Sequence, residues 1–355
     1  MNTSFWSGKK VLVTGHTGFK GSWLCLWLQH LGATVTGFAL NPSSNPNFYE
    51  LTSINRCMSN NIGDIRDYKC ILNLILQYEP EVVIHMAAQS LVRYSYIHPV
   101  ETYSTNIMGT INLLEAVRQT SSVRAVVNVT SDKCYENKEW IWGYRENEAL
   151  GGNDPYSSSK GCAELVTSSY RNSFFNPSNY SLHKVALATA RAGNVIGGGD
   201  WSDDRLIPDT IRALSIGQRV AIRNPNAIRP WQHVLEPLSG YLNLAEKLYT
   251  QGPKFSEAFN FGPVEDDARP VSWIVNELTK CWGGGASWIL DTTENPHEAQ
   301  HLKLDCSKAK NLLEWQGRWS LEKSLENIVF WHKAHLRGAN MREISLAQIE
   351  SFTNT

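Results

Sequence analysis

Tyr156 and Lys160 are the two side chains best placed for proton transfer, because they stand four residues apart after Pro155, where a helix can begin. Positions i and i+4 share one face of a helix. A nearby cation favours the phenolate, so we expect Lys160 to lower the pKa of Tyr156 toward neutrality and make it a general base for an alcohol. The same spacing recurs at Tyr180 and Lys184, in a predicted loop before a strand, and we interpret that pair as structural.

A second group of reactive side chains closes the apolar run Arg124–Thr130. It supplies two hydroxyls, a carboxylate and an amine, from Thr130, Ser131, Asp132 and Lys133. In a parallel sheet, ligands bind beyond the carboxyl ends of the strands, so these groups are candidates to contact a substrate. The alternative is an Asx-turn at Asp132 beside a solvated lysine.

A glycine-rich turn follows the first apolar strand and precedes a helical run. Gly15 permits a tight turn, Gly18 lets a phosphate approach the backbone, and Gly21 lets the helix pack on the strand. The helix N-terminus then faces an anion, which predicts a dinucleotide site; a purely structural turn is the alternative. The expected cofactor contacts are Gly15, His16, Thr17, Gly18, Phe19, Lys20 and Gly21. Lys20 could neutralise a phosphate, or be an ordinary solvated lysine.

The elements that must position these residues alternate between strand and helix patterns. Apolar strands are predicted at Lys10–Thr14, Thr34–Leu40, Glu81–His85, Arg124–Thr130 and Val185–Ala190. Helices are predicted at Ser22–Leu31, Arg66–Gln77, Val100–Gln119 and Tyr156–Phe174. Apolar strands separated by amphipathic helices indicate an α/β fold with a doubly wound, Rossmann-type parallel sheet.

The pattern of predicted elements and the composition of the sequence change after residue 191. We expect residues 1–191 to form the dinucleotide-binding domain, with segments from about 233–262 returning to it. Residues 192–336, rich in prolines and short elements, are expected to form a smaller C-terminal substrate-binding lobe that includes a helix at Leu321–Leu336. Residues 337–355 are polar, and we expect them to be poorly ordered or part of an interface.

The bulk properties exclude several classes of protein. The 355 residues carry a formal net charge of -1, which argues against binding to nucleic acid. No apolar run is long enough for a transmembrane helix, and the first residues lack the pattern of a signal peptide. The seven cysteines are scattered without a C-x-x-C pair, which fits reduced thiols in the cytoplasm and no metal site.

Two further motifs complete a family resemblance. These motifs are residues 85–89 (H-M-A-A-Q) and 191–195 (R-A-G-N-V). Together with the glycine turn and the Tyr156–Lys160 pair, they make the chain resemble the extended short-chain dehydrogenase/reductases. The resemblance extends from about residue 9 to about residue 336. The run 130–133 (T-S-D-K) is similar to the sugar-nucleotide 4,6-dehydratase branch. With residues 16–21 and 229–234 it is most similar to the members of that branch that act on CDP-glucose. Members that act on dTDP-glucose carry Asp-Glu where this chain has Asp132-Lys133.

The resemblance implies a three-step reaction with NAD, which yields CDP-4-keto-6-deoxyglucose for deoxysugar biosynthesis of the O-antigen (lipopolysaccharide) type. Tyr156 takes the proton of the sugar 4-hydroxyl, with Ser131 or Thr130 hydrogen-bonding the 4-oxygen. Asp132 suits the acid that releases water from carbon 6. The base at carbon 5 stays open: a neutral Lys133, Glu136, or a cationic Lys133 that stabilises an enolate.

The resemblance also extends the cofactor site. The implied residues are Asn41, Asp64, Ile65, Ala87, Ala88, Gln89 and Asn106, together with Tyr156 and Lys160. The second strand ends without the acid that often binds a ribose, so Asn41 could replace it. No arginine stands there to accept a 2′-phosphate, which agrees with NAD. A buried helical asparagine is an equal interpretation of Asn106.

The residues that would bind the substrate are less clearly indicated than those that would bind the cofactor. The candidates are Asn194, Arg205, Arg229, Arg269 and His297, although each arginine alone is compatible with a surface role. In the family the helices 100–119 and 156–174 pair across a two-fold axis, which implies a homodimer or a dimer of dimers. The choice of CDP over dTDP or GDP rests on resemblance alone. A 4-epimerase, a decarboxylase or a non-catalytic NAD-binding sensor or scaffold remain the alternatives.

Overall fold

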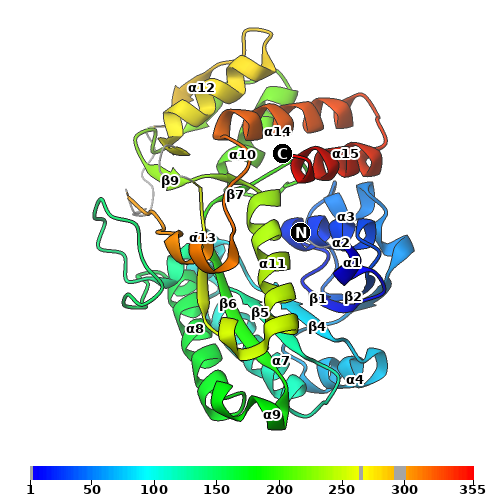
Figure 1. The fold of residues 1–355 in the computed structure, drawn as a ribbon. Coiled ribbons are helices and arrows are strands. Elements are labelled where there is room, and N and C mark those ends of the chain that lie inside the picture. The colour runs from blue at the N-terminus through cyan, green and yellow to red at the C-terminus, as the bar shows by residue number, and fades with distance from the viewer. Residues whose placement is uncertain (1–2, 264–266, 292–300) are drawn as a thin grey trace.

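A seven-stranded parallel sheet forms the centre of the molecule (Figure 1). The structure is a computed structural model that describes residues 3–263, 267–291 and 301–355. The strands are β1 (Lys10–Thr14), β2 (Thr34–Ala39), β3 (Ser59–Ile62), β4 (Val82–His85), β5 (Ala125–Val129), β6 (Ala186–Ala192) and β11 (Ala258–Phe261). The prediction of a doubly wound α/β fold is confirmed.

The strand order explains where a ligand can bind. The order is β11-β6-β5-β4-β1-β2-β3, so the chain builds outward from β1 in one direction and from β4 in the other. The register pairs Thr14 of β1 with His85 of β4 at their carboxyl ends. Connections leave these two neighbouring strands toward opposite edges of the sheet, which opens a crevice between them.

Helices cover both faces of the sheet, as Figure 1 shows. One face packs on α4 (Tyr68–Tyr78), α7 (Gly109–Arg118) and α8 (Pro155–Ser173), and the other on α2 (Phe19–His30) and α11 (Leu235–Gln251). Val11 and Val13 belong to the core on the α2 side, whereas Leu12 belongs to the core on the α4 side. Side chains alternate along a strand, so both faces of β1 are apolar and buried.

A smaller lobe lies beyond one edge of the sheet, at the top of Figure 1. Its helices are α10 (Leu206–Ser215), α12 (Val271–Trp282) and α14 (Leu321–Leu336), which enclose a separate apolar cluster. Its strands form two-stranded ribbons: β7 (Val195–Ile196) with β10 (Gln232–His233), β8 (Val220–Ile222) with β13 (Trp288–Leu290), and β9 (Ile228–Pro230) with β12 (Ala268–Pro270). Between these elements the chain returns to the large sheet, where α11 covers it and β11 extends it.

Several short helices lie between these elements. They are α1 (Thr3–Trp6), α3 (Phe48–Leu51), α5 (Val92–Ile97), α9 (Tyr180–His183), α13 (Ser307–Leu313) and the 3-10 turns at Ile54–Cys57, Asp132–Cys134, Pro177–Asn179 and Gly252–Phe255. Tyr180 therefore begins α9 rather than lying in the predicted loop. Within the described ranges, no helix combines the length and apolar character that crossing a membrane requires.

The helix predicted over Val100–Gln119 is interrupted. Its parts are α6 (Pro99–Tyr103), a π-helical turn at Ser104–Met108 and α7. One extra residue in a helical turn changes which side chains face the core, and such turns often occur at functional sites. Asn106 lies in the π-helical turn.

The segment 337–355 was expected to be a polar tail, and the prediction of poor order is wrong. It contains the helix α15 (Met341–Thr353), which packs on α14 and α2. Ile349 and Phe352 are fully buried, and the Phe352 ring makes edge contacts with Trp27 and Trp319. These two apolar residues, three positions apart on one helix face, anchor an otherwise polar segment.

Candidate active site

A cavity of about 840 Å³ lies at the carboxyl edge of the sheet and is closed on its other side by the smaller lobe. Its lining includes residues that follow β1, β2, β4, β5 and β6, and residues of α10, β8 and β9. It therefore opens at the crevice that the strand order requires.

The glycine turn forms one wall of this cavity. Gly15 has φ +77°, and a Cβ there would stand 2.8 Å from the backbone nitrogen of Ala87. A Cβ on Gly21 would collide with the Gly15 carbonyl oxygen, whereas a Cβ on Gly18 would make an ordinary contact with that oxygen at 3.4 Å. The turn ends at α2, whose N-cap is Gly18. The lining of the cavity includes Gly15, Thr17, Gly18, Phe19, Lys20 and Gly21.

The Lys20 ammonium is placed among other cations. Burial, together with the positive charges of Lys160 and Arg205, lowers the pKa of Lys20 to about 7, while the charge of Asp132 opposes the shift. An anion in the cavity would reverse this shift, because a negative charge favours the protonated amine. The solvated surface lysine considered from the sequence does not describe this position.

The second wall contains most of the remaining predicted cofactor residues. Asn41, Asp64, Ile65, Ala87 and Ala88 line the cavity. Thr17 Oγ1 donates a hydrogen bond to the Leu40 carbonyl oxygen (2.8 Å), which joins the turns after β1 and β2. The Asp64 carboxylate accepts bonds from Nε and Nη2 of Arg66, and this pairing lowers the pKa of Asp64.

Three predicted cofactor residues support this wall without lining it. His16 is fully buried and its Nε2 lies 2.6 Å from Asn60 Oδ1. Asn106 accepts a bond from the Gln89 backbone N–H (2.9 Å), and its side-chain amide donates to the Gln89 carbonyl (3.0 Å) and to Ser159 Oγ (2.8 Å). Asn106 therefore fixes the loop after β4 against α8. The Gln89 side chain bonds its own loop at Leu91.

Tyr156 lines the cavity in the first turn of α8, which is capped by Asp154. Burial raises the pKa of Tyr156 to about 12, and a hydrogen bond with Ser131 and the charge of Arg205 act in the opposite direction. The prediction that this pKa lies near neutrality is therefore wrong for the structure as it stands. Tyr180 and Lys184, the other pair with this spacing, are not among the lining residues.

Lys160 lies one helical turn after Tyr156 and is buried. Its Nζ donates a long hydrogen bond to the Val129 carbonyl oxygen at 3.4 Å. Burial lowers the pKa of Lys160 to about 8, and the carboxylate of Glu164 opposes that shift. Because its ammonium is directed toward β5, Lys160 acts on the phenol less directly than the sequence spacing suggested.

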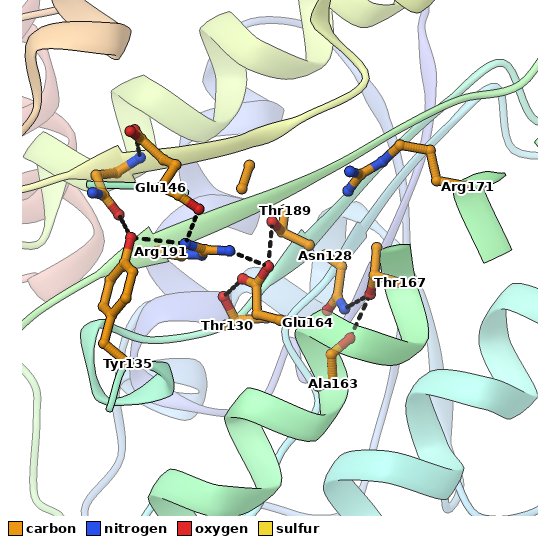
Figure 2. Close-up of polar contacts among 12 residues, drawn as sticks. Asn128, Thr130, Tyr135, Glu146, Ala163, Glu164, Thr167, Arg171, Thr189 and Arg191 are labelled. Carbon is orange, nitrogen blue, oxygen red and sulfur yellow. Dashed lines mark hydrogen bonds and ion pairs between the residues drawn. The ribbon is translucent and has the colours of Figure 1, made fainter. Parts of the chain in front are cut away.

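The residues after β5 meet Tyr156 at the cavity, where Thr130, Ser131, Asp132 and Lys133 all line it. Thr130 Oγ1 donates to Glu164 Oε1 at 2.5 Å, so its proton is directed away from a ligand (Figure 2). Ser131 Oγ donates to Asp132 Oδ1 (3.0 Å) and bonds Tyr156. Ser131 is therefore the better candidate of the two to contact a sugar oxygen.

Asp132 is the carboxylate best placed for chemistry in the cavity. It is 1% exposed, and no described residue hydrogen-bonds its buried Oδ2. A Cβ on Gly193 would stand 2.5 Å from that oxygen, so the glycine leaves the space that the carboxylate needs. A buried polar atom without a partner is costly unless a ligand or proton satisfies it, which marks Asp132 Oδ2 as a functional group.

The two candidates for the base at carbon 5 differ in position. Lys133 lines the cavity, and no described carboxylate forms an ion pair with its ammonium. Glu136 is exposed, lies 4.0 Å from Lys138 Nζ, and is not among the lining residues. The geometry therefore favours Lys133 over Glu136 as the base at carbon 5.

Arg205 reaches across the cavity from the smaller lobe. Its Nη1 pairs with Asp200 Oδ2 (3.0 Å), and its Nη2 donates to Ser90 Oγ (3.1 Å) on the loop after β4. Asp200 is 3% exposed, so the guanidinium is anchored on a buried carboxylate. The sequence analysis missed Asp200 and Ser90, since a loop contact across 115 residues leaves no local pattern.

The other candidate substrate-binding residues differ in whether they line the cavity. Asn194 and Arg229 line the cavity. Arg269 is paired with Arg229 across the β9–β12 ribbon, but it is exposed, stacks on Trp273 and is not among the lining residues. That placement does not support a substrate contact for Arg269. His297 lies outside the described residues.

The geometry fits a dinucleotide beside a sugar nucleotide. The glycine turn places backbone without side chains at a helix N-terminus that lines the cavity, while cationic side chains and one unpaired carboxylate oxygen face the same cavity. A phenol and a serine hydroxyl bonded to it can exchange a proton with an alcohol. The adjacent Asp132 and Lys133 can move protons at the neighbouring carbon atoms.

Comparison with known proteins agrees with this arrangement. Residues 12–328 match the family described as GDP-mannose 4,6 dehydratase. A CDP-glucose 4,6-dehydratase of Salmonella typhimurium is 58% identical over 352 residues, which cover 99% of this chain and 98% of the relative.

Solved structures share the fold at lower sequence identity. A dTDP-glucose 4,6-dehydratase of Bacillus anthracis in complex with NAD has a TM-score of 0.76 at 21% identity, covering 94% of this chain and 100% of that one. A UDP-glucose 4-epimerase of Thermotoga maritima with UDP-glucose has a TM-score of 0.79 at 23% identity, covering 92% and 99%. The chain therefore belongs to the extended short-chain dehydrogenase/reductases, in the family of sugar-nucleotide dehydratases and epimerases.

Proposed function

We propose that this protein converts CDP-glucose to CDP-4-keto-6-deoxyglucose and water, as a hydro-lyase with NAD as its cofactor. The observation that carries the proposal is the 58% identity to a CDP-glucose 4,6-dehydratase over nearly the whole of both chains. The meeting of Tyr156, Asp132 and Lys133 in one cavity supports it, because a dehydratase needs acid and base groups beyond the phenol.

The residues of both walls fit NAD. The glycine turn would hold the diphosphate, and Asn41 would bind the adenosine ribose. The sequence predicts no arginine there to bind a 2′-phosphate, which agrees with NAD. When bound, NAD supplies the hydride chemistry: a hydride leaves carbon 4 of the sugar and is returned to carbon 6, with no net oxidation. Ala87 and Ala88 leave room for the cofactor beside the end of β4.

The side chains of the cavity perform the proton transfers. Tyr156 takes the proton of the 4-hydroxyl, and Ser131 is proposed to contact the same sugar oxygen. The separate hydrogen bond between Ser131 and the phenol acts to lower the pKa of Tyr156. The ketone acidifies the proton on carbon 5. Asp132 donates a proton to the departing 6-hydroxyl, for which its unpaired Oδ2 is suitably placed. Arg205 and Arg229 are proposed to bind the diphosphate of the substrate.

Lys133 is proposed as the base at carbon 5. We expect Lys133→Ala to slow deuterium uptake at carbon 5 in D₂O by about 10²- to 10⁴-fold, the usual contribution of a general base. Mass spectrometry or NMR of the sugar measures the uptake. Lys138→Ala is the matched control, since this nearby lysine is exposed and is not among the lining residues. Uptake at the wild-type rate in Lys133→Ala would remove Lys133 from this role.

A substrate screen tests the function as a whole. We expect CDP-glucose to be turned over in preference to dTDP-, UDP- and GDP-hexoses, with the alkaline absorbance of a 4-keto-6-deoxy sugar as the readout. Turnover of CDP-glucose to its 4-epimer would identify an epimerase. Bound NAD without turnover of any nucleotide sugar would identify a sensor or scaffold. The product would serve deoxysugar biosynthesis of the O-antigen type in the cytoplasm.

A homodimer is proposed for the functional protein. Val100 on α6 and Leu165 on α8 are 81% and 59% exposed, and these two helices lie side by side. Exposed apolar side chains on adjoining helices favour burial against a second copy. We expect light scattering to give at least twice the mass of one chain, and Leu165→Glu to shift the protein toward monomer. A monomeric wild type would contradict this proposal.

A further inference from the structure

A buried ion pair lies beside the catalytic loop, a name that we give to residues 130–135. Glu164 on α8 and Arg191 on β6 meet at 2.8 Å between Oε2 and Nη2, with side chains 3% and 4% exposed (Figure 2). Burial raises the pKa of Glu164, but the charge and hydrogen bond of Arg191, with the hydrogen bonds from Thr130 and Thr189, outweigh that effect and lower the pKa. Glu164 therefore stays ionised in the interior.

The two members of the pair hold opposite ends of the catalytic loop. Thr130, the first residue, donates from Oγ1 to Glu164 Oε1 at 2.5 Å. Arg191 Nη1 donates to Oη of Tyr135, the last residue, at 2.8 Å, and this hydroxyl in turn donates to Asn260 Oδ1 at 2.7 Å. Figure 2 shows these contacts as one connected chain of dashed lines.

We propose that the Glu164–Arg191 pair is a clamp that positions Ser131, Asp132 and Lys133 against Tyr156. The clamp consists of the contacts Thr130–Glu164, Glu164–Arg191 and Arg191–Tyr135. Neither Glu164 nor Arg191 is among the residues that line the cavity, so both act through the loop rather than on the substrate. The effect on catalysis rests on the proposed function, whereas the effect on the loop does not.

Physical reasons support a positioning role. The loop carries three candidate catalytic side chains within six residues. The hydrogen bonds within the loop are long, from Lys133 N–H to Ser131 Oγ (3.2 Å) and from Cys134 N–H to the Ser131 carbonyl (3.3 Å). Its backbone is otherwise held near its two ends, where Thr130 N–H donates to the Ala190 carbonyl (3.0 Å) and the Cys134 carbonyl accepts from Gly151 N–H (2.9 Å). Holding both ends limits the freedom of the residues between them. A displacement of about 1 Å of a catalytic group can lower a rate on the order of 10²-fold.

Thr130 offers a cleaner test than Glu164. A change at Glu164 would also remove the charge that raises the pKa of Lys160. Thr130→Val keeps the shape of the side chain and removes only the hydroxyl. Thr189→Val is the matched control, because Thr189 Oγ1 donates to the same carboxylate at 2.8 Å from strand β6 and does not hold the loop.

The first readout is kinetic. We expect Thr130→Val to lower kcat on CDP-glucose by on the order of 10²-fold with little change in KM. Thr189→Val should keep the wild-type kcat, and Thr130→Ser, which restores the hydroxyl, should recover most of the loss. Tyr135→Phe, which removes the hydroxyl at the other end of the clamp, should lower kcat in the same way and serves if Thr130→Val fails to fold.

The second readout does not depend on activity. Hydrogen exchange of the loop amides, including those of Lys133 and Cys134, should be faster in Thr130→Val and Tyr135→Phe than in Thr189→Val. Equal losses of kcat and of protection in both threonine variants would overturn the clamp, and so would unchanged exchange and kcat in Thr130→Val. A wild type inactive on every nucleotide sugar would overturn the proposed function alone, and the exchange comparison would then decide the clamp.

Discussion

Tyr156→Phe is expected to lower kcat with CDP-glucose by about 10²- to 10⁴-fold, because it removes the phenol that we propose as the acceptor of the 4-hydroxyl proton. The phenyl ring fills the same buried space, so the fold and the binding of CDP should change little. Turnover is measured by the alkaline absorbance of the product, and binding of CDP by calorimetry.

Tyr180→Phe is the matched control for this change. It removes the tyrosine hydroxyl of the second Y-x-x-x-K spacing, which is not among the residues that line the cavity, and it should keep the wild-type rate. A Tyr156→Phe protein with wild-type turnover would refute the role of the phenol. Loss of deuterium uptake at carbon 5 should accompany the loss of turnover, since carbon 5 becomes acidic only after the 4-hydroxyl is oxidised.

Asp132→Asn is expected to lower product formation by about 10²- to 10⁴-fold for a different reason. The amide has nearly the shape of the carboxyl group but cannot supply the acidic proton that we propose Asp132 donates to the departing 6-hydroxyl. Oxidation at carbon 4 does not need that proton. Recovered CDP-glucose should therefore still take up deuterium at carbon 5 in D₂O, unlike the substrate recovered from Tyr156→Phe.

The contrast between these two variants makes the assignment of Asp132 testable. Mass spectrometry of substrate and product from the same reaction separates exchange at carbon 5 from loss of water. Product formation at the wild-type rate in Asp132→Asn would exclude the acid role. Loss of both exchange and product would instead place Asp132 at an earlier step. A melting temperature near that of the wild type excludes unfolding as the cause.

The sheet and the glycine turn were predictable because their signals are local. Apolar strands alternate with amphipathic helices along the first half of the chain, and Gly15, Gly18 and Gly21 stand at the spacing that the turn needs. The π-helical turn at Ser104–Met108 leaves no such signal, since the apolar pattern continues through it. The helix α15 was missed because its composition is polar and few side chains anchor it.

The sequence predicted many of the residues that line the cavity, but not the electrostatics of the cavity. The pKa of Tyr156 depends on how deeply the phenol is buried, which spacing along a helix does not give. Glu164 stands four residues after Lys160, so helical spacing could have suggested that it faces the same way. Its contact with Arg191 depends on the packing of α8 against β6, and that could be found only from the structure.

The path of the chain between the sheet and the smaller lobe limits how the molecule can be divided. A cut after residue 191 would remove α11, which covers the sheet, and β11, its edge strand next to β6. The bare edge and exposed apolar face would favour aggregation. The cofactor-binding half is thus a discontinuous domain that no single truncation can isolate, and we infer that both halves fold and unfold together.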